Sequence, residues 1–492
     1  MSLHFPSPEI LENTIRFISE HPEADPTSLA LGKGRLKDID IDLAINTLES
    51  RRKLRGKMPQ WYGQSGMIFP AKLSAEQCSS TLTGRYKAAL AAMIAGGKPF
   101  RIADLTGGLG VDSWYFSMEA SEVLYNEMQR ALCMAAEHNF RILGAGNIQF
   151  SNKCIIPEND ARRKDSTNPA NFTGSEGKAN YGEEAIHYAT ASEILSDFKP
   201  DIIYADPARR SESGRKVFLI EECSPDILSL KEELFALSRH ILLKLSPMAD
   251  ISMVCSRLGA SCRQVHVIGA SGECKELLIW MDREWSGDYT VKVVELGHKG
   301  ESVIEFTPEE EKTVCPAILS ENSVRRIQED RNFNQRWMFE PGKALMKAGA
   351  FSLVSARGGM FKTGVSTHYY IGTYQQCAEY SGLGKIFEIL RCEALDKGAL
   401  RQAAVDFPKA DITARNLPAD TETYRKILQA ERKKLKKSTR RNDAEAYVSV
   451  RADDFHIFCL KADKAGPLLI VGRRCLSSGV QDGEGQAQLS QD

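Results

Sequence analysis

Short apolar runs alternate with amphipathic stretches of about ten to fifteen residues between positions 100 and 282 of this chain. The apolar runs include FRIADL, EVLYNEM, NIQFSN, DIIYAD and HILLKLSP, and the stretches between them include RALCMAAEHNFRIL and SPDILSLKEELFALS. Strands that alternate with helices in this way form a parallel sheet covered on both faces. The predicted fold class is therefore α/β, with a Rossmann-like doubly wound sheet. Its last two strands, RQVHVIGA and CKELLIWMD, are separated by a short SGE turn and are expected to be antiparallel neighbours.

The sequence changes character on both sides of this region. Residues 1–70 carry apolar side chains at intervals of three and four, which predicts an N-terminal helical region. From about residue 285, the runs YTVKVVELG and SVIEFT predict strands that open a mixed α+β region. Residues 157–184 are polar and are expected to form a mobile surface insertion in the sheet region. The polar tail, 477–492, is expected to be disordered.

Composition excludes several classes of protein. The chain has 64 lysines and arginines against 65 aspartates and glutamates, so any basic surface for a nucleic acid must be local. The first residues lack a signal-peptide pattern, and no apolar run approaches the roughly 20 residues that span a bilayer, which predicts a cytoplasmic protein. The twelve cysteines occur without a CxxC pair and the nine histidines without HxH or HExxH spacing, so we expect reduced thiols and no metal site.

The first strand of the predicted sheet ends on Asp104 and leads into LTGGLGVDS. Glycines in this turn allow the backbone to approach a ligand closely at the carboxyl edge of the sheet. The dinucleotide pattern GxGxxG would require glycine at position 113, where Ser113 stands, and no phosphate-loop GK[ST] is present. The pattern D-x-x-x-G-x-G instead favours S-adenosylmethionine (SAM), with Asp104 near the cationic methionine moiety and Gly108 and Gly110 beside the nucleoside. A purely structural turn and another nucleotide are the alternatives.

Glu127 ends the second strand, 23 positions after Asp104. A carboxylate at this place can accept hydrogen bonds from both ribose hydroxyls of an adenosine. The sequence therefore predicts a ribose-binding acid on the strand next to the glycine-rich turn.

Asp206 ends the fourth strand of the pattern, in DIIYADPARR. In SAM enzymes that modify exocyclic amines, a [DNS]PP[YFW] motif lies here, and its side-chain oxygen and a backbone carbonyl orient the amine toward the methyl group. Pro207 would fix the turn. No aromatic residue follows, and Arg209 and Arg210 are predicted to stack on a base or hold a phosphate. The alternative is a capped strand with arginines in solvent.

A cysteine nucleophile would need a thiol at the same edge. Cys223 is the nearest in sequence, but Glu221 and Glu222 beside it oppose thiolate formation. We expect Cys223 to be a buried small residue.

Several runs together carry a resemblance that spans residues 60–475. They are SSTLTGRYKAAL, DLTGGLGVDS, DIIYADPARR, ILLKLSPMADI, GECKELLIW, EPGKALMKAGAF, THYY, GKIFEIL, ITARNLPAD and LLIVGRRC. The chain resembles a bacterial family of class I SAM-dependent methyltransferases with a C-terminal THUMP-like domain. The resemblance implies a methyltransferase domain at 71–283, a ferredoxin-like segment at 285–328 and a THUMP-like domain at 329–476. THUMP domains occur in RNA-modifying enzymes. A more distant likeness is to ribosomal RNA guanine-N2 methyltransferases.

Site residues follow from the resemblance by position. The implied cofactor-binding residues are Asp104, Thr106, Gly108, Gly110, Glu127 and Lys87, and the implied catalytic residues are Asp206, Pro207, Arg209 and Arg210. Residues that precede the first strand are expected to close over the methionine end of SAM: Ser79, Ser80, Thr83, Tyr86 and Lys87. The chain departs from the family at two places. Only Ser192 and Glu193 are available for the adenine contact, and the two glycines of RGGM at 357–360 are expected to loosen a turn.

Residues 425–441 form a local basic stretch with nine lysines or arginines and one glutamate. Such a stretch attracts RNA phosphates, although it can also be the solvated face of a helix. The aromatic run HYY at 368–370 could stack on bases or alternate between core and surface. The predicted function is a SAM-dependent methyltransferase that acts on a base nitrogen of structured RNA (rRNA or tRNA). The alternatives are an RNA-binding protein whose methyltransferase fold binds SAM without catalysis, and a methyltransferase for proteins or small molecules.

Overall fold

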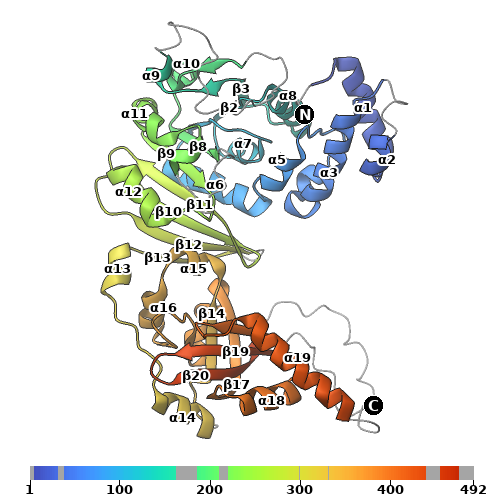
Figure 1. The fold of residues 1–492 in the computed structure, drawn as a ribbon. Helices are drawn as coiled ribbons and strands as arrows, with labels where there is room; N and C mark the ends of the chain where they lie inside the picture. Colours follow the sequence, from blue (N-terminus) through green and yellow to red (C-terminus); the bar gives the residue numbers. More distant parts are fainter. Residues whose placement is uncertain are drawn as a thin grey trace, which may run out of the picture. The chain divides into compact units, whose positions relative to one another are not determined.

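The computed structural model describes residues 5–31, 38–161, 186–209, 220–297, 300–330, 332–438 and 455–475. Most of the predicted insertion at 157–184, Arg210 and the tail at 477–492 lie outside these residues. The chain divides into two compact units (Figure 1). The first unit comprises 1–270, 275–291 and 296–298, and the second comprises 271–274, 292–295 and 299–492.

Helices form the N-terminal part of the first unit, as predicted. They are α1 (Pro8–Glu20), α2 (Pro26–Leu31), α3 (Ile41–Lys57), α4 (Pro59–Tyr62), α5 (Lys72–Gln77) and α6 (Thr81–Ile94). Helix α3 begins where the side chain of Asp40 accepts a hydrogen bond from the amide of Leu43 at 2.9 Å. Ile18 of α1 packs on Ala44 and Leu48 of α3, so these helices share a small apolar core.

A mixed sheet forms the centre of the first unit (Figure 1). Its strands are β1 (Arg101–Asp104), β2 (Glu122–Asn126), β3 (Ile148–Ser151), β6 (Ile202–Ala205), β9 (His240–Leu245), β10 (Cys262–Ala270) and β11 (Glu273–Asp282). The order is β3-β2-β1-β6-β9-β11-β10, followed in the same sheet by β12 (Thr290–Gly297) and by β13 (Gly300–Phe306), whose residues belong to the second unit. The pairs from β3 to β9 are parallel, and β11 runs antiparallel to β9. The predicted doubly wound α/β fold is confirmed.

Helices and short strands connect this sheet. They are α7 (Val111–Phe116), α8 (Arg130–Leu143), β4 (Cys154–Ile155), α9 (Glu158–Ala161), β5 (Tyr188–Ala189), α10 (Ala191–Leu195), β7 (Ala208–Arg209), η2 (Ile220–Glu222), β8 (Cys223–Ser224), α11 (Ile227–Leu237), α12 (Ile251–Leu258) and η3 (Gly259–Ser261). The predicted SGE turn joins β10 to β11, with Ser271 and Gly272 both at positive φ (55° and 76°) as a tight hairpin requires. Because the strand order reverses at β1, ligands are expected at the carboxyl ends of β1 and β6.

The second unit contains a seven-stranded sheet in the order β15-β16-β14-β17-β20-β19-β18. These strands are β14 (Trp337–Pro341), β15 (Phe361–Lys362), β16 (Tyr370–Gly372), β17 (Gly384–Ala394), β18 (Asp411–Arg415), β19 (Phe455–Ala462) and β20 (Gly466–Cys475). The helices are α13 (Pro308–Thr313), α14 (Glu321–Glu329), α15 (Lys343–Ala348), α16 (Phe351–Gly358), α17 (Tyr374–Ala378), η4 (Ser381–Leu383), α18 (Lys397–Asp406) and α19 (Thr421–Ser438). The predicted C-terminal α+β region is confirmed.

Both faces of this sheet are covered, because alternate residues of β19 enter different cores. Phe458 and Leu460 pack in one core with Val324 of α14, whereas Ile457 and Cys459 pack in another with residues of α18 and α19. Of the HYY run, Tyr369 and Tyr370 are 4% and 1% exposed, so their rings belong to the core and are not free to stack on bases.

The turn at RGGM is tight, contrary to the expectation from the sequence. Gly359 ends α16 at φ 60°, and a Cβ atom on Gly358 would lie 2.7 Å from Cε of Met360 and 2.9 Å from Cε2 of Tyr380. Both glycines therefore serve packing and backbone conformation.

Candidate active site

The turn after β1 is held closely against β2 and α8. Gly108 and Gly110 adopt φ of 56° and 84°, a backbone region that favours glycine. A Cβ atom on Gly110 would lie 2.4 Å from Phe140, and one on Gly107 would lie 2.1 Å from the ring of Tyr125. The Tyr125 hydroxyl donates to the carbonyl of Gly108 at 2.6 Å. Glycine is therefore required here by packing as well as by backbone conformation.

Asp104 braces this turn from inside. Its carboxylate accepts from the amide of Thr106 at 3.0 Å and from the hydroxyl of Ser113 at 2.6 Å. Asp104 is 1% exposed, and this burial raises its pKa to about 7. Ser113, which replaces the last glycine of a dinucleotide pattern, is thus a partner of the strand-end acid. Direct contact between Asp104 and the methionine moiety stays a prediction.

Glu127 follows β2 and faces the same turn. Its Oε2 accepts from the amide of Gly108 at 2.9 Å, and its Oε1 accepts from the amide of Gln129 at 2.8 Å. The side chain is buried, which raises its pKa. Each carboxylate oxygen can accept a second hydrogen bond, so two neighbouring hydroxyl groups of a ribose can be bound here. These residues fit SAM.

Asp206 lies at the end of β6, beside β1. Its backbone amide donates to Oγ1 of Thr106 at 2.6 Å, and its Oδ2 accepts from Nζ of Lys244 at 2.6 Å. The Asp206 side chain is 38% exposed, whereas Pro207 is buried. Arg209 lies in β7, which pairs with β8; its side chain and all of Arg210 are outside the described residues.

Lys87 is fully buried at the centre of a charged cluster. Its ammonium group lies 2.7 Å from Oγ of Ser79, 2.7 Å from Oε1 of Glu276 and 3.2 Å from Oδ1 of Asp112. The contacts with Ser79 and Glu276 are hydrogen bonds, and the contact with Asp112 is an ion pair. The structure gives Lys87 a bracing position, and its contact with the cofactor stays a prediction.

Asp112 joins this cluster to the strand ends. Its Oδ2 accepts from the hydroxyls of Ser79 at 3.0 Å and Tyr204 at 2.7 Å, and it lies 3.9 Å from Nζ of Lys244. Burial alone would raise the pKa of Asp112, but the neighbouring Lys87 and Lys244 hold it below its usual value. Burial also opposes the charge of Lys244, but Asp206 and Asp112 raise its pKa.

The other residues expected at the site have structural partners. Ser80 and Thr83 form the capping box that begins α6, and Tyr86 hydrogen-bonds Nδ1 of His266 at 2.7 Å. Glu193 forms a capping box with Thr190, so the expected adenine contact through Glu193 would compete with a helix cap. Cys223 is buried, as expected. Among the residues that the structure describes, no cluster of histidine, cysteine, aspartate or glutamate could hold a metal ion, and no helix is long and apolar enough to cross a membrane.

Sequence reasoning missed Asp112, Glu276, Tyr204 and Lys244. Lys244 is the lysine within the apolar strand HILLKL, and Glu276 is the acid that precedes LLIW in β11. A charge within a run of otherwise buried strand residues was the available signal, because such a charge requires a partner.

Over nearly its full length the chain resembles one solved structure. A crystal structure described as a "putative methyltransferase" from Porphyromonas gingivalis W83 is 25% identical, with a TM-score of 0.72, and the match covers 97% of this chain and 100% of that chain. Weaker likenesses include a ribosomal protein L11 methylase from Lactobacillus delbrueckii subsp. bulgaricus (15% identity, TM-score 0.24, 41% of this chain and 79% of that chain). Another is a "putative RNA methyltransferase" from Pyrococcus horikoshii (14% identity, TM-score 0.24, 45% and 80%). These two TM-scores are too low to support an argument.

Residues 337–376 match the family model of a ferredoxin-like domain. The resemblance implied a ferredoxin-like segment at 285–328, whereas this match lies within 329–476, the range implied for the THUMP-like domain. The matched residues include no cysteine, so the description concerns a fold rather than iron–sulfur ligands. No curated protein sequence matches the chain. The chain thus has a methyltransferase fold with a ferredoxin-like segment, and the THUMP-like assignment of 329–476 stays a prediction.

Proposed function

We propose that this chain is a SAM-dependent methyltransferase that acts on a base nitrogen of structured RNA, either rRNA or tRNA. One observation carries the proposal: Thr106, in the glycine-rich turn, binds the backbone amide of Asp206 at 2.6 Å. This bond joins a turn that fits SAM to a DP motif on the adjacent strand. A methyl donor and an acceptor amine would therefore meet at the carboxyl edge of β1 and β6.

The cofactor would be held by Glu127 at the ribose and by the backbone around Gly108 and Gly110. SAM, when bound, would supply an activated methyl group and leave as S-adenosylhomocysteine, and the acceptor nitrogen would give up one proton. The protein contributes position and electrostatics. The Asp206 carboxylate and the Pro207 carbonyl would accept the amine hydrogens and direct the lone pair. Asp206 or water would take the released proton.

RNA as the substrate is supported by the basic stretch at 425–441 and by the resemblance to a family with a THUMP-like domain. Of its described side chains, Lys426 and Lys433 are exposed. Arg425 lies 2.8 Å from a Glu422 oxygen, and Arg432 donates to the carbonyls of Phe407 and Ala410. Exposed lysines at the surface of α19 can contact phosphates.

The test is transfer of tritium from methyl-labelled SAM to RNA from cells that lack this protein. We expect the RNA to be labelled, and Asp206→Ala to abolish labelling while SAM still binds. A matched control is Asp201→Asn at the other end of the same strand, where the carboxylate accepts from the Arg101 amide at 2.8 Å. The Asp201→Asn variant should transfer tritium to RNA at the normal rate. Label in a protein fraction and none in RNA would refute the RNA proposal, and SAM binding without transfer to any fraction would indicate a non-catalytic binding protein.

A further inference from the structure

Lys244 occupies an unusual place for a lysine. It lies near the end of β9, and its side chain is only 11% exposed. The register of β6 and β9 pairs Ala205 with Leu243, so the next residue of each strand brings Asp206 beside Lys244. Burial of an ammonium group is costly unless it is paired, and the Asp206 oxygen at 2.6 Å provides the pair.

The pair is the outer end of a series of alternating charges. Lys244 lies 3.9 Å from Asp112, Asp112 lies 3.2 Å from Lys87, and Lys87 lies 2.7 Å from Glu276. Together with Asp206, the series holds three carboxylates and two ammonium groups, a net charge of one negative. Its inner end is buried, since the Glu276 side chain is 5% exposed, whereas Asp206 is partly open to solvent. The interior of the fold therefore restrains a group that faces the acceptor.

We propose that Lys244 is a positioning residue for methyl transfer, fixing the Asp206 carboxylate through Oδ2 so that Oδ1 receives the acceptor. This inference rests on the proposed function. Thr106 holds the Asp206 backbone amide while Lys244 holds its side chain, so the residue is fixed at two points. Within the described part of the chain, Oδ1 accepts no hydrogen bond. One lone-pair-bearing oxygen thus stays available for a hydrogen of the acceptor amine.

The pairing also affects which acceptor is favoured. An isolated carboxylate would attract a cationic amine, such as a protonated lysine side chain. A carboxylate already paired with an ammonium group attracts a cation less, and it still accepts hydrogen bonds from a neutral amine. The exocyclic amine of a nucleobase is neutral at physiological pH, so the Asp206–Lys244 pair suits a base nitrogen.

The first test is a double-mutant cycle on methyl transfer to RNA. Lys244→Met should lower kcat about 10–100-fold with the KM for RNA changed less than about threefold, because positioning acts in the transition state. In an Asp206→Asn background, Lys244→Met should lower kcat less than about threefold, since the carboxylate that Lys244 fixes is already absent. Lys244→Arg keeps the charge and should recover part of the rate. If the rate losses of the two single variants multiply in the double variant, Lys244 acts independently of Asp206, and the proposal is overturned.

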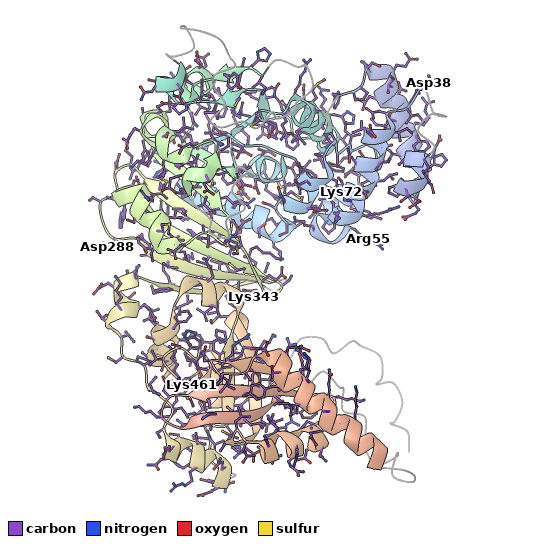
Figure 2. All side chains as sticks on the ribbon, in the orientation of Figure 1. Asp38, Arg55, Lys72, Asp288, Lys343 and Lys461 are labelled. Carbon is purple, nitrogen blue, oxygen red and sulfur yellow. The ribbon has the colours of Figure 1, made fainter. Side chains whose placement is uncertain are left out.

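The control is Lys72→Met. Lys72 lies on α5 (Figure 2) and forms an ion pair of similar length, 2.9 Å to Glu49, with 42% of its side chain exposed. This variant should transfer at the normal rate. Should Lys244→Met not fold, Lys244→Arg serves in its place: a planar guanidinium displaces the carboxylate and should reduce kcat about 3–10-fold at unchanged SAM affinity. A wild-type rate in that variant would also refute the positioning role.

The second test needs no acceptor. Sinefungin carries an amine-bearing carbon in place of the methylated sulfur, so its affinity relative to S-adenosylhomocysteine reports the electrostatics at the acceptor position. By calorimetry, Asp206→Asn should lower this ratio about 3–10-fold, and Lys244→Met should raise it by a similar factor. An unchanged ratio in Lys244→Met would mean that Lys244 does not act at the acceptor position. Absence of RNA labelling would refute the proposed substrate and leave this measurement intact.

Discussion

The hydroxyl of Thr106 and the backbone amide of Asp206 lie 2.6 Å apart, although the two residues are 100 positions apart in the chain. Thr106 belongs to the turn after β1, and Asp206 follows β6. The hydrogen bond thus connects the predicted cofactor turn directly to the predicted acceptor motif. This bond gives Thr106 a second role, in holding the acceptor motif, because the resemblance assigned Thr106 only to cofactor binding.

Thr106→Val should uncouple the two loops. Valine keeps the shape of threonine but cannot accept the Asp206 amide, and an unpaired buried donor costs about 1–3 kcal/mol. We expect a kcat for methyl transfer lowered about tenfold, with SAM affinity within about threefold of normal. Thr106→Ser retains the hydroxyl and is the matched control. Equal rates for the valine and serine variants would show that the bond is dispensable.

Glu127→Gln should weaken SAM binding. An amide offers one oxygen where the carboxylate offers two, so one of the two ribose hydroxyls loses its acceptor. The dissociation constant measured by calorimetry should rise about 10–100-fold, which corresponds to about 1.4–2.7 kcal/mol. Glu122→Gln, at the other end of β2, where the carboxylate pairs with Arg101 at 3.0 Å, is the comparison and should bind SAM normally. Normal affinity in Glu127→Gln would remove Glu127 from the cofactor site.

Asp104 should make the stability of the first unit depend on pH. Burial raises its folded-state pKa to about 7 from the 3.8 of an exposed group. Between these values Asp104 binds more protons in the folded state than in the unfolded state, so its contribution to stability is greatest below pH 4 and declines as pH rises to 7. The full loss in the free energy of unfolding from this one group is roughly 4 kcal/mol. Urea unfolding at pH 5 and pH 8 should show a smaller decline for Asp104→Asn than for the unmodified chain, and equal declines would contradict this account.

The strand ends were predictable because a strand–helix alternation identifies the carboxyl edge of each strand. Asp104, Glu127 and Asp206 each close an apolar run, so the sequence placed them at one edge, and the structure has them there. Lys244 could not be predicted in the same way. It lies within a strand, and its pairing with Asp206 depends on the β6–β9 register, which the sequence does not specify.

Distant pairings were also beyond sequence reasoning. Lys87 and Glu276 are 189 positions apart, and no local pattern connects them. The resemblance placed Lys87 near the methionine end of SAM, but its complete burial among three oxygens became visible only with the fold. Burial likewise decides the pKa of Asp104, and burial of a strand-end side chain depends on the turn that covers it.

Lys87→Met should destabilise the first unit strongly. The substitution leaves Glu276 and Asp112 buried without their shared cation, and breaking a buried pair costs about 3–5 kcal/mol. Urea unfolding measures this loss, and Lys87→Met combined with Glu276→Gln should recover part of it because one unpaired charge is removed. Lys72→Met breaks a partly exposed pair and should cost less than about 1 kcal/mol. A Lys87→Met variant of normal stability but poor SAM affinity would instead support the direct cofactor contact.

RNA binding should depend on salt through the exposed lysines of α19. Each phosphate contact contributes a slope of about 0.7–0.9 in the logarithm of affinity against the logarithm of salt concentration. Lys426→Gln with Lys433→Gln should therefore flatten that slope by up to about 2 in a filter-binding titration. Lys464→Gln, an exposed lysine between β19 and β20, is the matched control and should leave the slope unchanged. If the control flattens the slope as much as the double variant, the attraction is general to the surface and α19 is not the docking site.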